Sequence, residues 1–228
     1  MDEHAVHPDR MRVSELFIPG HTLTWRFFAG LEWPWEALPL ITSYVQELGA
    51  ELDVSEYELQ PDNIWIHKSA SIAPSAFIGP NVIIGARTNV RHCAYIRGPA
   101  IVGEGAVVGN STELKNVILF DGVQVPHYNY VGDSILGYRS HMGAGVITSN
   151  VKSDSSLVSV CVGDKRIKTG LKKFGVILGD NVEVGCNAVF NPGSVVGSRA
   201  TVYPLSMVRG YVPADSIYKK QGEVVQKR

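Results

Sequence analysis

The sequence predicts an all-β solenoid, a parallel β-helix built from hexapeptide repeats. The first observation is a run of aliphatic residues spaced six apart: Ile66, Ile72, Ile78, Ile84, Val90, Ile96, Val102, Val108 and Leu114. The second is a smaller residue four positions later: Ala70, Ala76, Val82, Thr88, Ala94, Ala100, Ala106 and Thr112. An α-helix repeats about every 3.6 residues and an exposed strand about every 2, so neither explains this spacing. A short strand plus a corner, three to a triangular coil, does explain it.

Glycines and a second run extend the pattern. Glycine, which tolerates the dihedral angles of a corner, follows the aliphatic residue at Gly79, Gly85, Gly103 and Gly109. The same period returns at Leu178, Val184, Phe190, Val196, Val202 and Val208. Between the runs it continues with slips through Val125, Val131, Leu136 and Met142. Such a long run makes chance spacing in another sheet protein remote, and we expect the solenoid over residues 61–213.

Residues 1–60 are expected to form an N-terminal arm and a helical cap. Residues 1–20 show no periodicity, which is typical of an arm or a mobile segment. Pro34 and Gly49 bracket a stretch with helical spacing at Leu38, Ile41, Val45 and Leu48. This spacing predicts one amphipathic helix, and stacked coils leave an open end that such a helix can cover.

Two further segments depart from the repeat. Residues 151–175 are polar and rich in lysine, which is typical of a projecting, often functional loop on one edge of a solenoid. Residues 214–228 are charged, and we expect this C-terminal tail to leave the helix.

The composition narrows the class of protein. The formal net charge of −1 favours neither nucleic acid nor an anionic membrane as a partner. Cys93, Cys161 and Cys186 are widely spaced, fit no metal-ligand pattern and cannot all pair, which indicates a reducing compartment. The first residues lack the pattern of a signal peptide, and no apolar run approaches the roughly 18 residues of a membrane span. We therefore expect a cytoplasmic protein.

Polar residues with chemical potential gather where the repeat breaks. A neutral histidine such as His127 is a natural base for an attacking amine or hydroxyl. Glu113 precedes it by 14 residues, close to one coil, and is expected to lie beneath it. Arg97 and Lys115 are 18 residues apart, so they should stack on one edge and bind a phosphate or carboxylate. Taken singly, each also fits a plain surface role, and Glu113 fits a pair with Lys115.

A longer motif makes the pattern more specific. From about residue 64 to 213 the chain resembles the C-terminal acetyltransferase domain of the bacterial bifunctional N-acetylglucosamine-1-phosphate uridyltransferase. Two stretches carry the resemblance, His127–Gly137 (HYNYVGDSILG) and Met142–Asn150 (MGAGVITSN). The resemblance implies that the β-helix is left-handed. It also implies a homotrimer with the active site between subunits.

The resemblance also implies a role for individual residues. His127 would be the catalytic base, oriented by Glu113. An amino sugar phosphate would be bound by Arg97, Lys115, Tyr130 and Lys173. Acetyl-CoA would lie at Ala144 and Asn150, and backbone N–H groups near Ala144 would stabilise the oxyanion.

Three positions depart from the family's pattern. His141 stands where the family has asparagine and faces the sugar phosphate, Val151 replaces tyrosine, and Cys186 replaces a serine on the acetyl-CoA side. The excursion at residues 151–175 is also longer. No glycine-rich nucleotidyltransferase loop precedes the solenoid, so uridylyl transfer by this chain is not expected.

The sequence therefore predicts an acetyl-CoA-dependent N-acetyltransferase acting on an amino sugar 1-phosphate, with no metal cofactor. One alternative is a non-catalytic sugar-phosphate-binding or regulatory solenoid that partners a separate nucleotidyltransferase. A zinc hydratase on the same fold would need histidines converging from neighbouring coils, typically with a pair five positions apart. No such pair exists among His4, His7, His21, His67, His92, His127 and His141.

Overall fold

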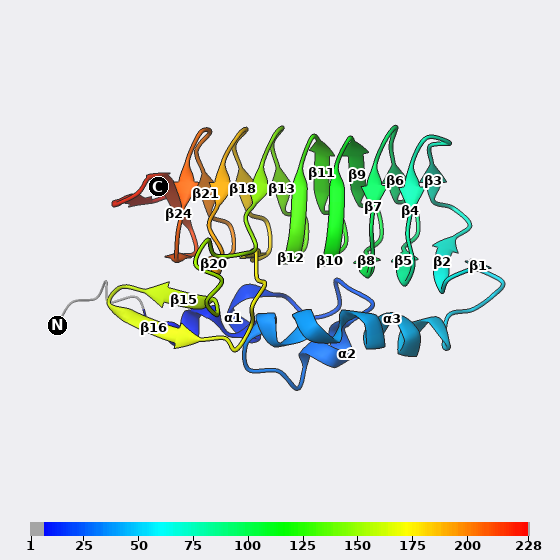
Figure 1. Ribbon diagram of the computed structural model, residues 1–228, viewed down its shortest axis with the longest axis horizontal. Helices are drawn as coiled ribbons and strands as arrows, with labels where there is room; N and C mark the ends of the chain where they lie inside the picture. Colours follow the sequence, from blue (N-terminus) through cyan, green and yellow to red (C-terminus); the bar gives the residue numbers. More distant parts are fainter. Residues whose placement is uncertain (1–6, 228) are drawn as a thin grey trace.

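A computed structural model describes residues 7–227 and shows a parallel β-solenoid whose coils stack along the long axis (Figure 1). The register follows the predicted repeat. Ile66 lies opposite Ile84, Ile84 opposite Val102, and Val102 opposite Leu119. Each coil therefore contains about three hexapeptides, and the predicted parallel β-helix is confirmed.

The strands form two sheets that wrap the solenoid. The larger contains β1 (Tyr57–Gln60), β2 (Ile64–His67), β4 (Phe77–Ile78), β5 (Val82–Ile84), β7 (Tyr95–Ile96), β8 (Ala100–Val102), β10 (Glu113–Leu119), β12 (Tyr130–Leu136), β14 (Ile147–Thr148), β17 (Val176–Leu178), β19 (Val189–Phe190), β20 (Ser194–Val196), β22 (Met207–Val208) and β23 (Tyr211–Val212). The other contains β3 (Ser71–Ile72), β6 (Asn89–Val90), β9 (Val107–Asn110), β11 (Gln124–His127), β13 (His141–Met142), β18 (Glu183–Val184), β21 (Thr201–Val202), β24 (Ser216–Lys220) and β25 (Glu223–Gln226).

The larger sheet spans two faces because β10 and β12 continue through a corner. The corner residues Asn116 and Asp133 have φ angles of 56° and 48°, in the left-handed region that Asn and Asp tolerate. In the preceding coil the strand is interrupted at this corner, so that β7 pairs with the first part of β10 and β8 with the last part. The column that contains Asn116 and Asp133 becomes important for the site described below.

The N-terminal segment lies along the flank of the solenoid (Figure 1). Its elements are η1 (Pro8–Met11), α1 (Val13–Leu16), α2 (Trp25–Phe28), η2 (Pro34–Leu40) and α3 (Ile41–Gly49). The predicted helix is present as α3, and Ile41, Val45 and Leu48 are buried. It contacts β5, β8 and β10 along the side of the stack. The prediction that this helix covers the open end of the first coil was therefore wrong.

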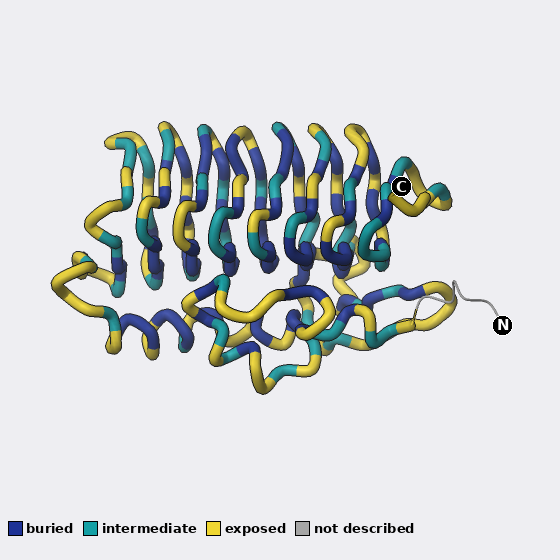
Figure 2. Tube along the Cα trace, turned by 180° about the vertical axis from the view of Figure 1, so that it is seen from behind, coloured by how far each residue is buried: buried dark blue, intermediate teal, exposed yellow. Residues whose placement is uncertain are grey.

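The flank needs this cover because its strands are apolar on both sides. The position next to the inward-facing residue is also apolar. On three successive coils it is occupied by Ile83, Ile101 and Ile118, all fully buried. Strands buried on both faces read as continuous apolar runs. Figure 2 shows buried stretches in the N-terminal segment as well as along the coils. The Asp180 carboxylate of the solenoid accepts a hydrogen bond from the Ile18 N–H and so holds the segment in place. Its other oxygen accepts from the Tyr138 N–H within the solenoid.

Antiparallel strands lie at both ends of the stack. At the first coil, β1 pairs with β2. At the last, β24 continues the parallel ladder on β21, and β25 folds back against β24. The prediction that residues 214–228 leave the helix was therefore wrong for the described part of this tail. Tyr218 is buried within it, which supplies the apolar contact that the charged composition had obscured.

The excursion at residues 151–175 interrupts the repeat as predicted. It contains the antiparallel hairpin β15 (Ser159–Val162) and β16 (Lys165–Lys168). The hairpin is seated on the solenoid, since Val158, Val160 and Val162 are buried. Across residues 7–227, no helix combines the length and hydropathy needed to cross a lipid bilayer.

Candidate functional site

His127, Ala144 and Cys186 share one edge of the solenoid. His127 ends β11 and is exposed, and its carbonyl accepts a hydrogen bond from the Gly145 N–H (3.0 Å). The ladder registers of β11 with β13 and of β13 with β18, extended by three residues, place Ala144 and Cys186 on the next two coils. The predicted base and two of the predicted acetyl-CoA residues therefore come together in the fold.

The imidazole of His127 makes no hydrogen bond with any other side chain of residues 7–227. The backbone N–H of Ala144 likewise donates no hydrogen bond within this part of the chain. One coil edge thus offers a free imidazole and a free backbone donor. Both are what proton abstraction and oxyanion stabilisation require.

Glu113 has a different partner from the one expected. It begins β10, one coil from Tyr130, and its Oε1 lies 2.9 Å from Arg97 Nη1. This hydrogen bond is the main cause of the raised pKa of Arg97. Glu113 and His127 flank the same corner of the solenoid, yet the described residues contain no hydrogen bond between them.

Asp133 gathers three side chains into a buried polar cluster. Its carboxylate lies 2.9 Å and 3.1 Å from Lys115 Nζ, 2.9 Å from Asn116 Nδ2 and 2.5 Å from Asn150 Nδ2. The Asp133 side chain is 5% exposed. Arg97 and Lys115 do stack on one edge, since the ladder places Ile96 beside Leu114, but each is already paired with a carboxylate of the chain.

Tyr130 joins this cluster through Asn150. The Asn150 amide donates to the Tyr130 hydroxyl at 3.3 Å. Burial raises the pKa of Tyr130 above its ordinary value. The phenolic hydroxyl can both donate and accept a hydrogen bond. Asn150, predicted to contact acetyl-CoA, is therefore held among the residues predicted for the sugar phosphate.

The last two predicted residues lie in different places. Lys173 is exposed. The next residue, Phe174, donates its N–H to the Asn150 carbonyl at 2.9 Å, so the backbone at Lys173 lies close to that of Asn150. His141 lies on β13, where its Nδ1 is 2.9 Å from Glu183 Oε2. The fold does not bring His141 to the Asp133 cluster, because β13 belongs to the other sheet.

Comparison with known proteins agrees with the motif. The bifunctional protein GlmU of Methanococcus aeolicus is 30% identical over 196 residues, 85% of this chain and 47% of that protein. This chain resembles GlmU. The bifunctional sugar-1-phosphate nucleotidylyltransferase/acetyltransferase of Sulfurisphaera tokodaii is 35% identical over 109 residues, 48% of this chain and 27% of that protein. The GlmU-like chain thus spans about half, or less, of the length of these relatives.

A solved structure of a hexapeptide transferase family protein from Anaplasma phagocytophilum matches 73% of the GlmU-like chain and 81% of its own. The two are 16% identical, with a TM-score of 0.42. No family model matches the sequence.

Asp133 is the residue of the GlmU-like site that sequence reasoning missed. It lies inside the quoted motif, 18 residues after Lys115, the same sequence spacing that related Lys115 to Arg97. Applying that spacing in both directions would have found it. Within residues 7–227, no three His, Cys, Asp or Glu side chains are grouped so as to hold a metal ion.

Proposed function

We propose that this protein is an acetyl-CoA-dependent N-acetyltransferase that acts on an amino sugar 1-phosphate. The observation that carries the proposal is the free, exposed imidazole of His127 on one edge with Ala144 and Cys186, in a chain that resembles GlmU over most of its length. Acetyl-CoA is the proposed co-substrate, lying along this edge.

In the proposed reaction, the acceptor amine attacks the thioester carbonyl while His127 takes a proton from the amine. The N–C bond forms, the C–S bond breaks, and the departing CoA thiolate takes the proton back from the imidazolium. The Ala144 N–H, which donates no hydrogen bond within residues 7–227, would stabilise the developing negative charge on the carbonyl oxygen. Replacing serine by Cys186 on this edge keeps a small side chain of similar reach.

Glu113 orients His127 in this scheme only by exchanging partners. Its carboxylate now holds Arg97, and movement toward the imidazole would leave the guanidinium free. A freed Arg97 is suited to the phosphate of the acceptor, because guanidinium groups bind phosphate oxygens in bidentate fashion. Substrate binding and base orientation would then be coupled through one ion pair.

We further propose a homotrimer. One outward-facing ladder crosses seven coils and is largely apolar: Phe77, Tyr95, Glu113, Tyr130, Ile147, Val189 and Met207. Phe77 is 59% exposed and Met207 50%, which is typical of a surface that pairs with a neighbour. Glu113 and Tyr130 stand in the middle of this ladder, so subunit contact would enclose the site. Light scattering coupled to size-exclusion chromatography measures this directly, and a monomer at micromolar concentration would refute it.

The activity is tested by CoA thiol release from acetyl-CoA, with glucosamine-1-phosphate and galactosamine-1-phosphate as acceptors. We expect acceptor-dependent release that falls by about 10²–10⁴-fold in His127→Ala. The matched control is His67→Ala, a histidine whose Nε2 pairs with Glu56 on the first coil. Unchanged release in His127→Ala would remove the mechanism. Sugar phosphate binding without any thiol release would instead support the non-catalytic, regulatory solenoid.

A further inference from the structure

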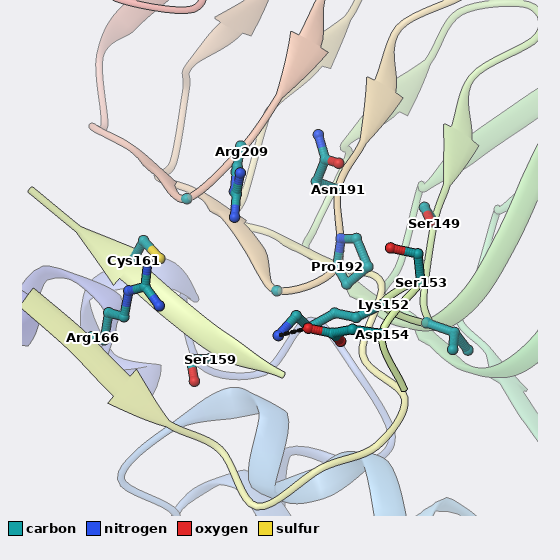
Figure 3. Close-up of a pocket in the computed structure, with 13 residues that line it drawn as sticks. Ser149, Lys152, Ser153, Asp154, Ser159, Cys161, Arg166, Asn191, Pro192 and Arg209 are labelled. Atoms are coloured by element: carbon teal, nitrogen blue, oxygen red, sulfur yellow. Dashed lines mark ion pairs between the residues drawn. The ribbon is translucent and has the colours of Figure 1, made fainter. Parts of the chain in front are cut away.

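A cavity of about 450 Å³ lies between the β15–β16 hairpin and the coils that carry β19 and β22 (Figure 3). Its solenoid side is one ladder position on three successive coils, occupied by Ser149, Asn191 and Arg209. Its hairpin side carries Ser159, Cys161 and Arg166. In Figure 3, Arg209 and Lys152 point into the space between solenoid and hairpin.

The hairpin that closes this cavity is fixed in place. Strand β15 alternates, so that its valines pack on the solenoid while Ser159 and Cys161 line the cavity. Gly193 and Gly210 have φ angles of 79° and 81°, and β15 approaches both closely. A Cβ on Gly193 would lie 2.7 Å from Val158 Cγ1, too close for any other residue without movement. The cavity is therefore a built feature of the fold.

The cavity is rich in positive charge. Lys152, Arg166 and Arg209 line it against a single carboxylate, Asp154, whose Oδ2 lies 3.5 Å from Lys152 Nζ. Neither arginine forms an ion pair with a carboxylate of residues 7–227. Two guanidinium groups that line the same cavity and pair with no described carboxylate attract an anion strongly.

Arg209 also extends the column that contains Arg97 and Lys115. The ladder runs from these two through Gly132, Ser149 and Asn191 to Arg209. Arg97 and Lys115 are paired with Glu113 and Asp133, whereas Arg209 forms no ion pair within residues 7–227. In this arrangement Arg209 is available to a ligand at the hairpin, whereas Arg97 would first have to leave Glu113.

We propose that the cavity beneath the hairpin binds a phosphate-bearing ligand, with Arg166 and Arg209 as its principal contacts. Guanidinium groups match phosphate oxygens in a bidentate geometry, and the hydroxyls of Ser149 and Ser159 add donors from either wall. Because the two arginines line opposite walls, a ligand with two linked phosphates offers each of them a phosphate group of its own. The proposal is independent of acetyl transfer, since it concerns binding alone.

Calorimetric titration of the full chain with inorganic pyrophosphate tests the site. We expect Arg166→Gln and Arg209→Gln each to weaken binding at least about tenfold, the loss of one charge-assisted contact. Lys165→Gln is the matched control, because Lys165 precedes Arg166 on the same strand, carries the same charge and does not line the cavity. Limited proteolysis confirms that the hairpin remains seated in each variant. Affinities within twofold of the parent in both arginine variants, or an equal loss in Lys165→Gln, would overturn the proposal.

Competition identifies the source of the phosphate. CoA, dephospho-CoA and glucosamine-1-phosphate are each titrated against bound pyrophosphate. Stronger displacement by CoA than by dephospho-CoA assigns the site to the 3′-phosphate end of the cofactor, and displacement by the sugar phosphate alone assigns it to the acceptor. His127→Ala should bind pyrophosphate normally, so failure of the catalytic proposal and failure of this site give different results.

Discussion

The Asp133 carboxylate should be the most sensitive polar position in the coil. Asp133→Asn removes the charge that neutralises Lys115, whose side chain is only 21% exposed, and turns an amide toward two amide donors. Breaking a buried pair by removing one partner costs about 3–5 kcal/mol. For a chain of this length, each kcal/mol lowers the midpoint by roughly 2–4 °C, so we expect a loss of about 6–20 °C.

Thermal unfolding followed by circular dichroism measures this loss. The matched control is Asp154→Asn, where the carboxylate is 64% exposed and lies 3.5 Å from Lys152. Exposed pairs contribute about 0–1 kcal/mol, so that midpoint should move by at most about 4 °C. The double variant Lys115→Met/Asp133→Asn should recover part of the loss, because no unpaired charge remains. Equal midpoints for Asp133→Asn and Asp154→Asn would refute the reasoning.

Three further predictions follow from single contacts. His127→Ala should leave the unfolding midpoint within about 2 °C of the parent while thiol release falls, since surface changes are usually within about 0.5 kcal/mol; a large drop in midpoint would give the histidine a structural role. Gly193→Ala should loosen the hairpin and speed its proteolysis, because the new Cβ meets Val158. Gly163 at the hairpin tip also has a positive φ but has open space around it, so Gly163→Ala carries the backbone strain without the clash and should have the smaller effect. Burial raises the pKa of Asp180 above its ordinary value of 3.8. The stability that Asp180 contributes is therefore present below pH 3.8 and is lost as the pH rises through the raised pKa. The difference in midpoint between the parent and Asp180→Asn should therefore shrink as the pH rises from 3.8 through the raised pKa. A difference that is constant with pH would exclude the raised pKa.

The sequence predicted which residues of the candidate site lie on neighbouring coils. It did not predict which of their side chains form ion pairs. A coil of about 18 residues placed Arg97 beside Lys115 correctly, because ladder position depends only on the repeat. Lys115 is 18 residues from both Arg97 and Asp133 in the sequence, and this spacing gives no preference between a stacked cation and a carboxylate. Competition among neighbouring side chains decides that, and it left both predicted phosphate ligands paired within the chain.

The repeat alone determined the solenoid, because each inward aliphatic residue packs against the equivalent residue of the next coil. The tertiary structure decided where everything else attaches. The position of α3 follows from the second apolar ladder of Ile83, Ile101 and Ile118, which must be covered from outside. The hairpin is seated where Gly193 and Gly210 allow close approach. These contacts join segments far apart in the chain, so their partners are chosen by exposed surface and available space, which no local period encodes.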